Sequence, residues 1–474
     1  MVGLSAASRQ VFDARVRDAL ADEVLQKVVA EGQDYMQALV EPVRAEAQWA
    51  AAIDEIARIR AHTLAHLDRY VDEFATNVEA RGGKVFFAAD AAEARRYVVD
   101  LAQQQRAKLI VKSKSMVTEE IELNPALESI GAKVVETDLG EFILQLAHEK
   151  PFHIVAPAIH KSLEQIRELF STAAGRELKA DAQALTEYAR GALREQFFAA
   201  DMGISGCNFG VAASGTVVLV TNEGNGRMTT TLPRTHVVVM GVERLVPTFA
   251  DLAPILKVLP WAGAGERITA YVTAITGPRR DDEADGPGEL HVVIVDNGRS
   301  RILGGKYEKI LTCIRCGACL DVCPVYRKIG GHSYDSVYPG PIGAVLSPLL
   351  DGLACHAELP FASSLCGACT EVCSAGIPLA DYIRQLREDS VSNGSAPTAW
   401  RLGFQAFAAA AVRPRFWAAA EAVALPFLRL LSERGALFNG RGPLAAWTRG
   451  RDFPRAEGTS FRAQWRRRPK RRAS

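Results

Sequence analysis

The sequence lacks the features that mark membrane-spanning, secreted and nucleic-acid-binding proteins. Its net charge is only +1, so no excess of cations favours nucleic acid as a partner. No stretch approaches the roughly 18 consecutive apolar residues that a membrane-spanning helix needs. The N-terminus, M-V-G-L-S-A-A-S-R-Q, does not join a basic start to an apolar run, as a secretory signal peptide would. We therefore expect a cytoplasmic protein.

Cysteine is scarce outside two short stretches, and a dinucleotide-binding fingerprint is missing. Of nine cysteines, only Cys207 and Cys355 lie outside these stretches, so a disulfide framework is not expected. No G-x-G-x-x-G follows an expected strand, which leaves no recognisable flavin or nicotinamide site. The composition that remains is globular, with 48% hydrophobic and 23% charged residues. A chain of 474 residues can form about two to four domains.

The first cysteine stretch is the most specific feature of the sequence. It reads C-x2-C-x2-C-x3-C-P, with cysteines at 313, 316, 319 and 323. Three thiolates at this spacing fit three corners of one cubane iron–sulfur cluster, and the fourth, followed by proline, reaches a second cluster. Structural zinc more often takes two C-x2-C pairs than this triple. The spacing therefore predicts 4Fe–4S clusters.

The second cysteine stretch is one ligand short, because Ser363 stands where a full copy would have cysteine. Crosswise ligation assigns Cys313, Cys316, Cys319 and Cys373 to cluster 1, and Cys323, Cys366 and Cys369 to cluster 2. The fourth corner of cluster 2 could come from Cys355 or from a Ser363 alkoxide. It could also be open, or filled by a partner or a small molecule. An open iron can bind substrate, but a second electron-transfer cluster is the favoured interpretation.

Most of the remaining chain has the pattern of an α/β protein. Residues 11–81 are expected to be helical, and the pair His62 and His66 on one helix face is interpreted as solvated rather than metal-binding. From 84 to about 277, short β-rich runs alternate with longer helical patterns, which indicates a largely parallel sheet. The expected strands are 85–87, 109–111, 133–135, 153–157, 217–221, 236–240 and 291–295. Helices are expected over 89–104 and 161–201.

Two polar stretches are candidates for an anion site. Lys112, Ser113, Lys114 and Ser115 directly follow an expected strand, where ligands bind in open α/β sheets. A solvated basic loop is the alternative. The Gly-rich run 222–227, close to Thr229–Thr231, could offer backbone N–H groups to an anion. On spacing alone, a hairpin turn is the favoured interpretation of this run.

The C-terminal part is less informative. A helix is expected over 377–387, and the sequence beyond 394 is helical and apolar. We interpret that part as a helical hairpin covering the cysteine region, with docking on a partner or contact with a membrane surface as alternatives. From Arg462, seven of the last thirteen residues are Arg or Lys. A solvated end is the default interpretation of this tail, and contact with anionic lipid or an acidic partner is the alternative.

Long runs of the sequence resemble a known family. The α/β region is similar to the LUD domain, and the whole chain resembles the lactate utilisation protein B family, the iron–sulfur subunits of the LutABC system. The resemblance covers most of the chain from about 85 to 380. The runs that carry it are 111–120, 134–142, 154–161, 200–206, 219–227, 231–236, 295–300, 338–343 and 363–373.

The resemblance implies a fold and a domain order. The fold is an α/β LUD domain, similar to CoA-transferase and ribose-5-phosphate isomerase, plus an α-helical ferredoxin-like domain with two 4Fe–4S clusters. The expected domains are an N-terminal helical region, the LUD domain, the iron–sulfur domain and a C-terminal helical extension. Their bounds are 1–83, 84–304, 305–393 and 394–474.

The resemblance also implies a function. Members take part in oxidising L-lactate to pyruvate, so the implied partners are LutA-like and LutC-like subunits and a further redox partner. The family's cluster ligands map onto the seven cysteines already assigned. One departure is that Ser374 follows Cys373 where ferredoxins have proline. Two alternatives remain: the LUD domain itself binds or transforms a small carboxylate or CoA thioester, or the clusters are structural.

Overall fold

The computed structural model describes residues 6–392, 398–433 and 459–468. The chain divides into two compact units, residues 1–395 and residues 396–474. Helices account for most of what is described in the second unit: α18 (Thr398–Ala411), α19 (Pro414–Glu433) and α21 (Phe461–Arg466). Within the described part of the chain, no helix has both the length and the apolar character needed to cross a membrane. The remaining basic tail, 469–474, lies outside the described residues.

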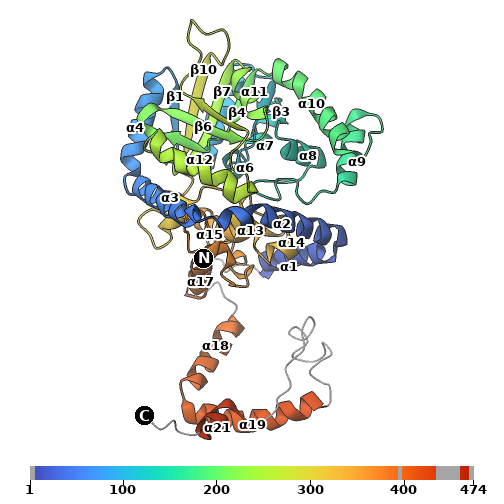
Figure 1. The fold of residues 1–474 in the computed structure, drawn as a ribbon, viewed down its shortest axis with the longest axis vertical. Helices are drawn as coiled ribbons and strands as arrows, with labels where there is room; N and C mark the ends of the chain where they lie inside the picture. The colour runs from blue at the N-terminus through green and yellow to red at the C-terminus, as the bar shows by residue number, and fades with distance from the viewer. Residues whose placement is uncertain (1–5, 393–397, 434–458, 469–474) are drawn as a thin grey trace. The chain divides into compact units, whose positions relative to one another are not determined.

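A six-stranded sheet forms the centre of the first unit (Figure 1). Its order is β1 (Lys84–Ala88), β10 (Glu289–Val295), β7 (Thr235–Gly241), β4 (Met202–Ser205), β2 (Leu109–Lys112) and β3 (Lys133–Glu136). Every pair of neighbours is parallel. The expected α/β fold with a parallel sheet is therefore confirmed. Its inner strands are apolar because both of their faces are buried, whereas the edge strand β1 is partly exposed.

The direction of the connections reverses between β2 and β4. From β2 the chain continues to β3 at one edge, whereas from β4 it continues to β7 and β10 toward the other edge. The residues that follow β2 and β4 therefore diverge at the carboxyl end of the sheet. In open α/β sheets this reversal creates the crevice in which ligands bind.

Helices cover both faces of the sheet. One face carries α5 (Ala91–Gln104), α6 (Met116–Glu120) and α7 (Leu123–Glu128), and the other α8 (Leu139–Ala147), α9 (Leu163–Ala174) and α10 (Ala182–Ala199). Alternate strand residues serve the two faces: Ile110 packs with the first set and Val111 with the second. The helical run expected over 161–201 is interrupted at Gly175, whose φ of 63° ends α9.

A smaller sheet packs beside the first. Its order is β8 (Leu245–Val246), β5 (Phe209–Val211), β6 (Thr216–Thr221) and β9 (Tyr271–Ile275), with α11 (Asn225–Thr231) and α12 (Phe249–Ala264) alongside. The hairpin turn favoured for 222–227 is wrong. The chain enters α11 there instead, and Gly224 has a φ of −72°, which a helix N-terminus accommodates without a left-handed residue.

Four N-terminal helices confirm the helical reading of residues 11–81: α1 (Ala6–Ala21), α2 (Glu23–Arg44), α3 (Gln48–Ala65) and α4 (Leu67–Ala80). On the buried face of α2, the Gln33 amide donates to Leu320 O at 2.7 Å and to Cys323 O at 3.3 Å. These bonds fix the helix to the first cysteine loop. The side chains of His62 and His66 are exposed, and they bond to Tyr70 and to a backbone carbonyl.

The cysteine region is built from short helices at one end of the α/β region, alongside the N-terminal helices (Figure 1). These are α13 (Ala318–Asp321), α14 (Tyr326–Ile329), α15 (Gly340–Leu350), α16 (Ala368–Glu371) and α17 (Leu379–Ser392). The strand expected over 153–157 is wrong, because this segment forms turns. His153 Nδ1 accepts from the N–H groups of Val155 and Ala156, so its side chain replaces a strand partner.

Candidate iron–sulfur centre and adjoining cavity

The two cysteine stretches have residues with positive φ at corresponding positions. Arg315 and Gly317 have φ angles of 63° and 80°, and Leu365 and Gly367 have 56° and 89°. Each pair lies directly before α13 or α16. A left-handed arginine and a left-handed leucine are both unusual, so each tight loop is held by its surroundings.

This correspondence places Ser363 at the position of Cys313. The Sγ atom of Cys313 accepts from Arg315 N at 3.4 Å, and Ser363 Oγ accepts from Leu365 N at 3.1 Å. The serine oxygen therefore points in the same local direction as a ligand sulfur. By contrast, Cys355 is exposed and sits in a turn closed by Gly352 O.

The thiols predicted for cluster 1 surround one small cavity. Its lining includes Cys313, Cys316, Cys319 and Cys373. Burial raises the pKa of the Cys316 thiol to about 12, and nearby Cys313 and Cys373 add to the rise. Burial, followed by Cys316, Cys313 and Cys373, also raises the pKa of Cys319. Thiolates gathered in this way need a cationic centre, so the donor set fits an iron–sulfur cluster.

The thiols predicted for cluster 2 form a second neighbourhood. Burial raises the pKa of Cys369 to about 11, and the nearest thiols that add to the rise are Cys323 and Cys366. Burial and the Cys366 thiol also raise the pKa of Cys323. Cys369 is buried, whereas Cys366 is exposed. This second neighbourhood therefore reaches the protein surface.

The spacing of the sulfurs disfavours a mononuclear zinc site. With zinc–sulfur bonds of about 2.3 Å, tetrahedral ligands would lie about 3.8 Å apart. Among the described residues, a group of three ligand atoms within 4.8 Å of one another is formed by Glu149, His160 and His332, and no cysteine belongs to it. Within the described ranges, no three cysteine sulfurs therefore lie as close together as a mononuclear zinc site needs.

Tyr334 is a site residue that no sequence pattern indicated. Its hydroxyl is buried and lacks a hydrogen-bond partner in the described part of the chain. Burial raises the pKa of Tyr334, and the thiols of Cys323, Cys319 and Cys369 raise it further. The phenol thus lies close to thiols of both neighbourhoods.

Ser374 has a role that its departure from the ferredoxin proline did not reveal. Its side chain is buried, and Oγ lies 3.1 Å from Cys316 Sγ. A cluster-bound thiolate has no proton, so the serine hydroxyl would donate. Hydrogen bonds to ligand sulfur are one of the levers that set a cluster's reduction potential.

We therefore expect Ser374→Ala to lower the midpoint potential of one cluster, because the reduced, more negative cluster loses a donor. A redox titration followed by EPR measures the shift. Ser364→Ala is the control, since Ser364 is exposed in the second stretch. An unchanged or higher potential in Ser374→Ala would show that the hydroxyl does not serve the cluster.

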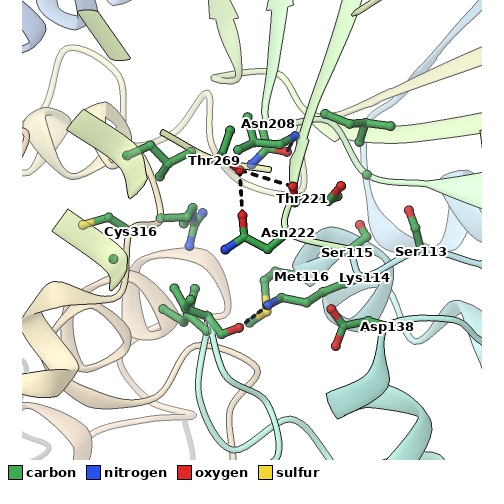
Figure 2. A pocket seen from close by; sticks show the side chains of 18 of the residues that line it. Ser113, Lys114, Ser115, Met116, Asp138, Asn208, Thr221, Asn222, Thr269 and Cys316 are labelled. Atoms are coloured by element: carbon green, nitrogen blue, oxygen red, sulfur yellow. Dashed lines mark hydrogen bonds between the residues drawn. The ribbon is translucent and has the colours of Figure 1, made fainter. Parts of the chain in front are cut away.

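A cavity of about 320 Å³ opens at the carboxyl ends of β2 and β4, where the connections reverse (Figure 2). Figure 2 shows Cys316 on one side, and Ser113, Ser115 and Asp138 on the other. Residues that follow β2 and β4 line it, as do residues from α12 and the first cysteine stretch. Gly263 of α12 is required here, because a Cβ atom would lie 2.9 Å from Cys316 O.

Both candidate anion stretches contribute to this one cavity. Ser113, Lys114 and Ser115 line it, together with Asn222 and Glu223 of the Gly-rich run. The solvated-loop alternative is wrong for the first stretch, because Ser113 and Ser115 are buried.

Two residues of the candidate stretches have other roles. Lys112 is fully buried and pairs with Glu119 at 2.5 Å and Glu136 at 2.8 Å, so it is not an anion ligand. Arg227 lies over the ring of Tyr271, outside the cavity lining.

The cavity wall nearest the cysteines contains several buried, charged side chains. Arg299 lies 2.7 Å from both Glu243 and Glu120, and the three side chains are at most 7% exposed. Burial alone would raise the pKa of Glu243, but Arg299 and then Arg315 outweigh it and hold this pKa at about 2. Arg315 Nη2 is 3.5 Å from Glu243 Oε1. The network joins the main sheet to the first cysteine loop.

Family models match both parts of the chain. Residues 71–295 match the LUD domain, and residues 309–377 match a 4Fe-4S dicluster domain. The protein is therefore a LUD-domain protein with an appended iron–sulfur domain. The cysteine neighbourhoods and the α/β sheet described above fall within these two matches.

Comparison with curated proteins identifies the family. The chain is 48% identical over 96% of its length to "Lactate utilization protein B" of Macrococcus caseolyticus, and also 48% identical over 96% to that of Bacillus licheniformis; each alignment covers 96% of the relative. It belongs to the lactate utilization protein B family. A solved DUF162-family protein from Deinococcus radiodurans matches at 13% identity and a TM-score of 0.27, covering 48% of this chain and 98% of its own.

Proposed function

We propose that this protein transfers electrons through two 4Fe–4S clusters in the oxidation of L-lactate to pyruvate. The family relationship supports the link to lactate, and the dicluster match supports the cofactor. The observation that carries electron transfer is the pair of adjoining thiol neighbourhoods. Cys369 of the second set is close enough to Cys319 of the first set to raise the pKa of that thiol.

The surroundings of the two sets support a direction for the electrons. Cys316, from the first set, also lines the large cavity. Cys366, from the second set, is exposed, and Leu365 and Phe361 beside it are 37% and 45% exposed. Electrons would enter at the set facing the cavity and leave at the surface set. The apolar surface around Cys366 is where we place the redox partner.

We assign the fourth corner of cluster 2 to the Ser363 position rather than to Cys355. Ser363 has the backbone setting and the hydrogen bond of its counterpart, Cys313. Oxidation of lactate needs a lactate-activating component, and we propose that LutA-like and LutC-like subunits supply it in an assembled complex. The chain's own contribution is to hold the clusters close together between the cavity and the surface.

Analysis of iron, acid-labile sulfide and EPR in the anaerobically purified protein tests this function. We expect iron and sulfide for two cubanes, and an EPR spectrum of two interacting clusters after reduction. Cys355→Ala should keep both clusters, whereas Ser363→Ala should lose iron or give a three-iron signal. Loss of a cluster in Cys355→Ala would contradict the Ser363 assignment. Bound zinc without clusters would contradict the function itself.

A further inference from the structure

The cavity contains a guanidinium that has one hydrogen-bond donor without an acceptor. Arg315 Nη1 is buried and has no hydrogen-bond partner in the described part of the chain. The side chain is 15% exposed, and its guanidinium lies 4.2 Å from the centre of the Tyr338 ring. A buried guanidinium N–H without an acceptor is costly. An anionic ligand in the cavity would remove this cost.

A second cation lies on the same lining. Lys114 follows β2, and its Nζ donates to Val155 O at 2.6 Å (Figure 2). An ammonium has three donors, so this single bond leaves capacity for a ligand. The third cation, Arg244, is already committed to the carbonyl oxygens of Asn208 and Cys313. Two cations, Arg315 and Lys114, therefore remain for an anion.

Two carboxyl groups face the cavity at the start of α8. Asp138 Oδ1 accepts from Gly140 N and Glu141 N, and Glu223 Oε2 accepts from Leu139 N at 3.2 Å. Burial and then the Asp138 carboxylate raise the pKa of Glu223 to about 7, against a smaller opposing effect of Lys114. Near pH 7 the Glu223 carboxyl group is therefore partly protonated, and its O–H can donate to a ligand oxygen.

The balance of charge limits the ligand. Glu243 also lines the cavity. It shares Arg299 with Glu120, and Arg315 compensates the rest of its charge. Glu266, a fourth acidic side chain of the lining, accepts from the Asn222 amide. The three cations of the lining, Lys114, Arg244 and Arg315, face four acidic side chains, so the cavity has no excess positive charge. A single carboxylate suits this balance, whereas a phosphate dianion would be repelled by the acids. The protonated Glu223 suits a neutral hydroxyl or carbonyl oxygen on the same ligand.

We propose that this cavity binds a small 2-hydroxy or 2-oxo carboxylic acid beside the first cysteine stretch. Arg315 and Lys114 pair with the carboxylate, and Glu223 hydrogen-bonds the neighbouring oxygen. The substrate class rests on the proposed function, whereas the binding site rests on the cavity itself. Because Cys316 lines the same space, the bound acid lies against the ligand loop of cluster 1.

Isothermal titration calorimetry on the anaerobic, cluster-loaded protein tests the site. The probes are L-lactate, pyruvate, inorganic phosphate and acetyl-CoA. We expect one equivalent of L-lactate or pyruvate to bind. Phosphate and acetyl-CoA should bind at least about tenfold more weakly, because they carry more negative charge and the acidic side chains of the cavity repel it. Equal or tighter binding of phosphate or acetyl-CoA would overturn the ligand class, and no binding of any probe would overturn the site.

Matched variants locate the binding. Arg315→Gln and Lys114→Gln should each weaken binding about tenfold or more, whereas Arg176→Gln and Lys179→Gln, on the exposed surface outside the cavity, should not. Lys114→Gln lies outside the cysteine loops, so it remains informative if Arg315→Gln loses iron. Equal affinity of Lys114→Gln and the parent protein would overturn the assignment of that lysine and of the site built around it.

The pH dependence gives an independent reading of Glu223. Deprotonation of Glu223 adds a negative charge and removes a donor, so affinity should fall as the pH rises through about 7. Glu223→Gln, which stays neutral, should bind with an affinity that is nearly independent of pH in this range. A fall of the same size in Glu223→Gln would overturn the role of this carboxyl group. All these measurements are made without turnover, so a failure here leaves the test of electron transfer intact.

Discussion

Replacing Arg299 by methionine should destabilise the protein by about 3–5 kcal/mol, because it leaves buried carboxylates without their cation. Arg299 is 1% exposed and lies 2.7 Å from both Glu120 and Glu243. Methionine keeps most of the arginine side-chain volume, so the loss of stability measures the missing positive charge rather than the creation of a cavity. The midpoint of unfolding of the anaerobic, cluster-loaded protein measures this change, with exposed Arg176→Met as the control.

The same variant should change how stability depends on pH. In the parent protein the folded pKa of Glu243, about 2, lies below its unfolded value. Its contribution is therefore complete above about pH 4.3 and is lost as the pH falls toward 2. Without Arg299 this pKa rises, so less is lost on acidification. A variant as stable as the parent at neutral pH would show that the network contributes no net stability.

Cys373→Ala should eliminate cluster 1 and spare cluster 2, whereas Cys369→Ala should do the reverse. The two cysteines come from the same stretch, four residues apart. Crosswise ligation places Cys373 in cluster 1, together with the loop that contains Cys313. In agreement, the pKa of Cys373 is raised by burial and, to a smaller extent, by the nearby Cys313 thiol. Cys373→Ala leaves cluster 1 with three ligands, and Cys369→Ala leaves cluster 2 with two thiolates and Ser363. Each variant has lost a cysteine ligand and should therefore lose about half of its iron.

EPR distinguishes the remaining clusters in these variants. The spectrum of Cys373→Ala should lack the cluster whose potential responds to Ser374→Ala, because Ser374 bonds Cys316 of the first set. The Cys369→Ala spectrum should retain it. If both variants lost the same cluster, each cysteine stretch would hold a cluster of its own, and the crosswise assignment would be wrong.

The sequence predicted what depends on local spacing. The cysteine intervals indicated the clusters, and alternating β-rich and helical runs indicated a parallel α/β sheet. It also located candidate ligand residues after the strand that ends at Lys112. Strand and helix periodicities and thiol spacing are set by neighbours in the chain, which is why these features could be read directly.

The errors and omissions have a different origin. Arg315 was not singled out from the sequence, because its cavity and its partner Glu243 come from distant segments. The apolar run after His153 resembled a strand, but the histidine side chain took the backbone donors. Lys112 was a candidate anion ligand, but in the structure its ammonium group pairs with Glu119 and Glu136. Partners from distant segments decided the case of Arg315 and, through Glu136, part of that of Lys112, whereas the hydrogen bonds of His153 are local and are not visible in an apolar pattern.

The bond between Gln33 and the carbonyl of Leu320 sets an order for biosynthesis. The two residues are 287 positions apart. At about 5–20 residues per second, α2 leaves the ribosome roughly 15–60 s before its partner loop exists. Throughout that interval the apolar face of α2 must be shielded by other means. The first cysteine loop, in turn, gains its bonds from Gln33 only when α2 docks, so the final conformation of this ligand loop depends on a segment made much earlier.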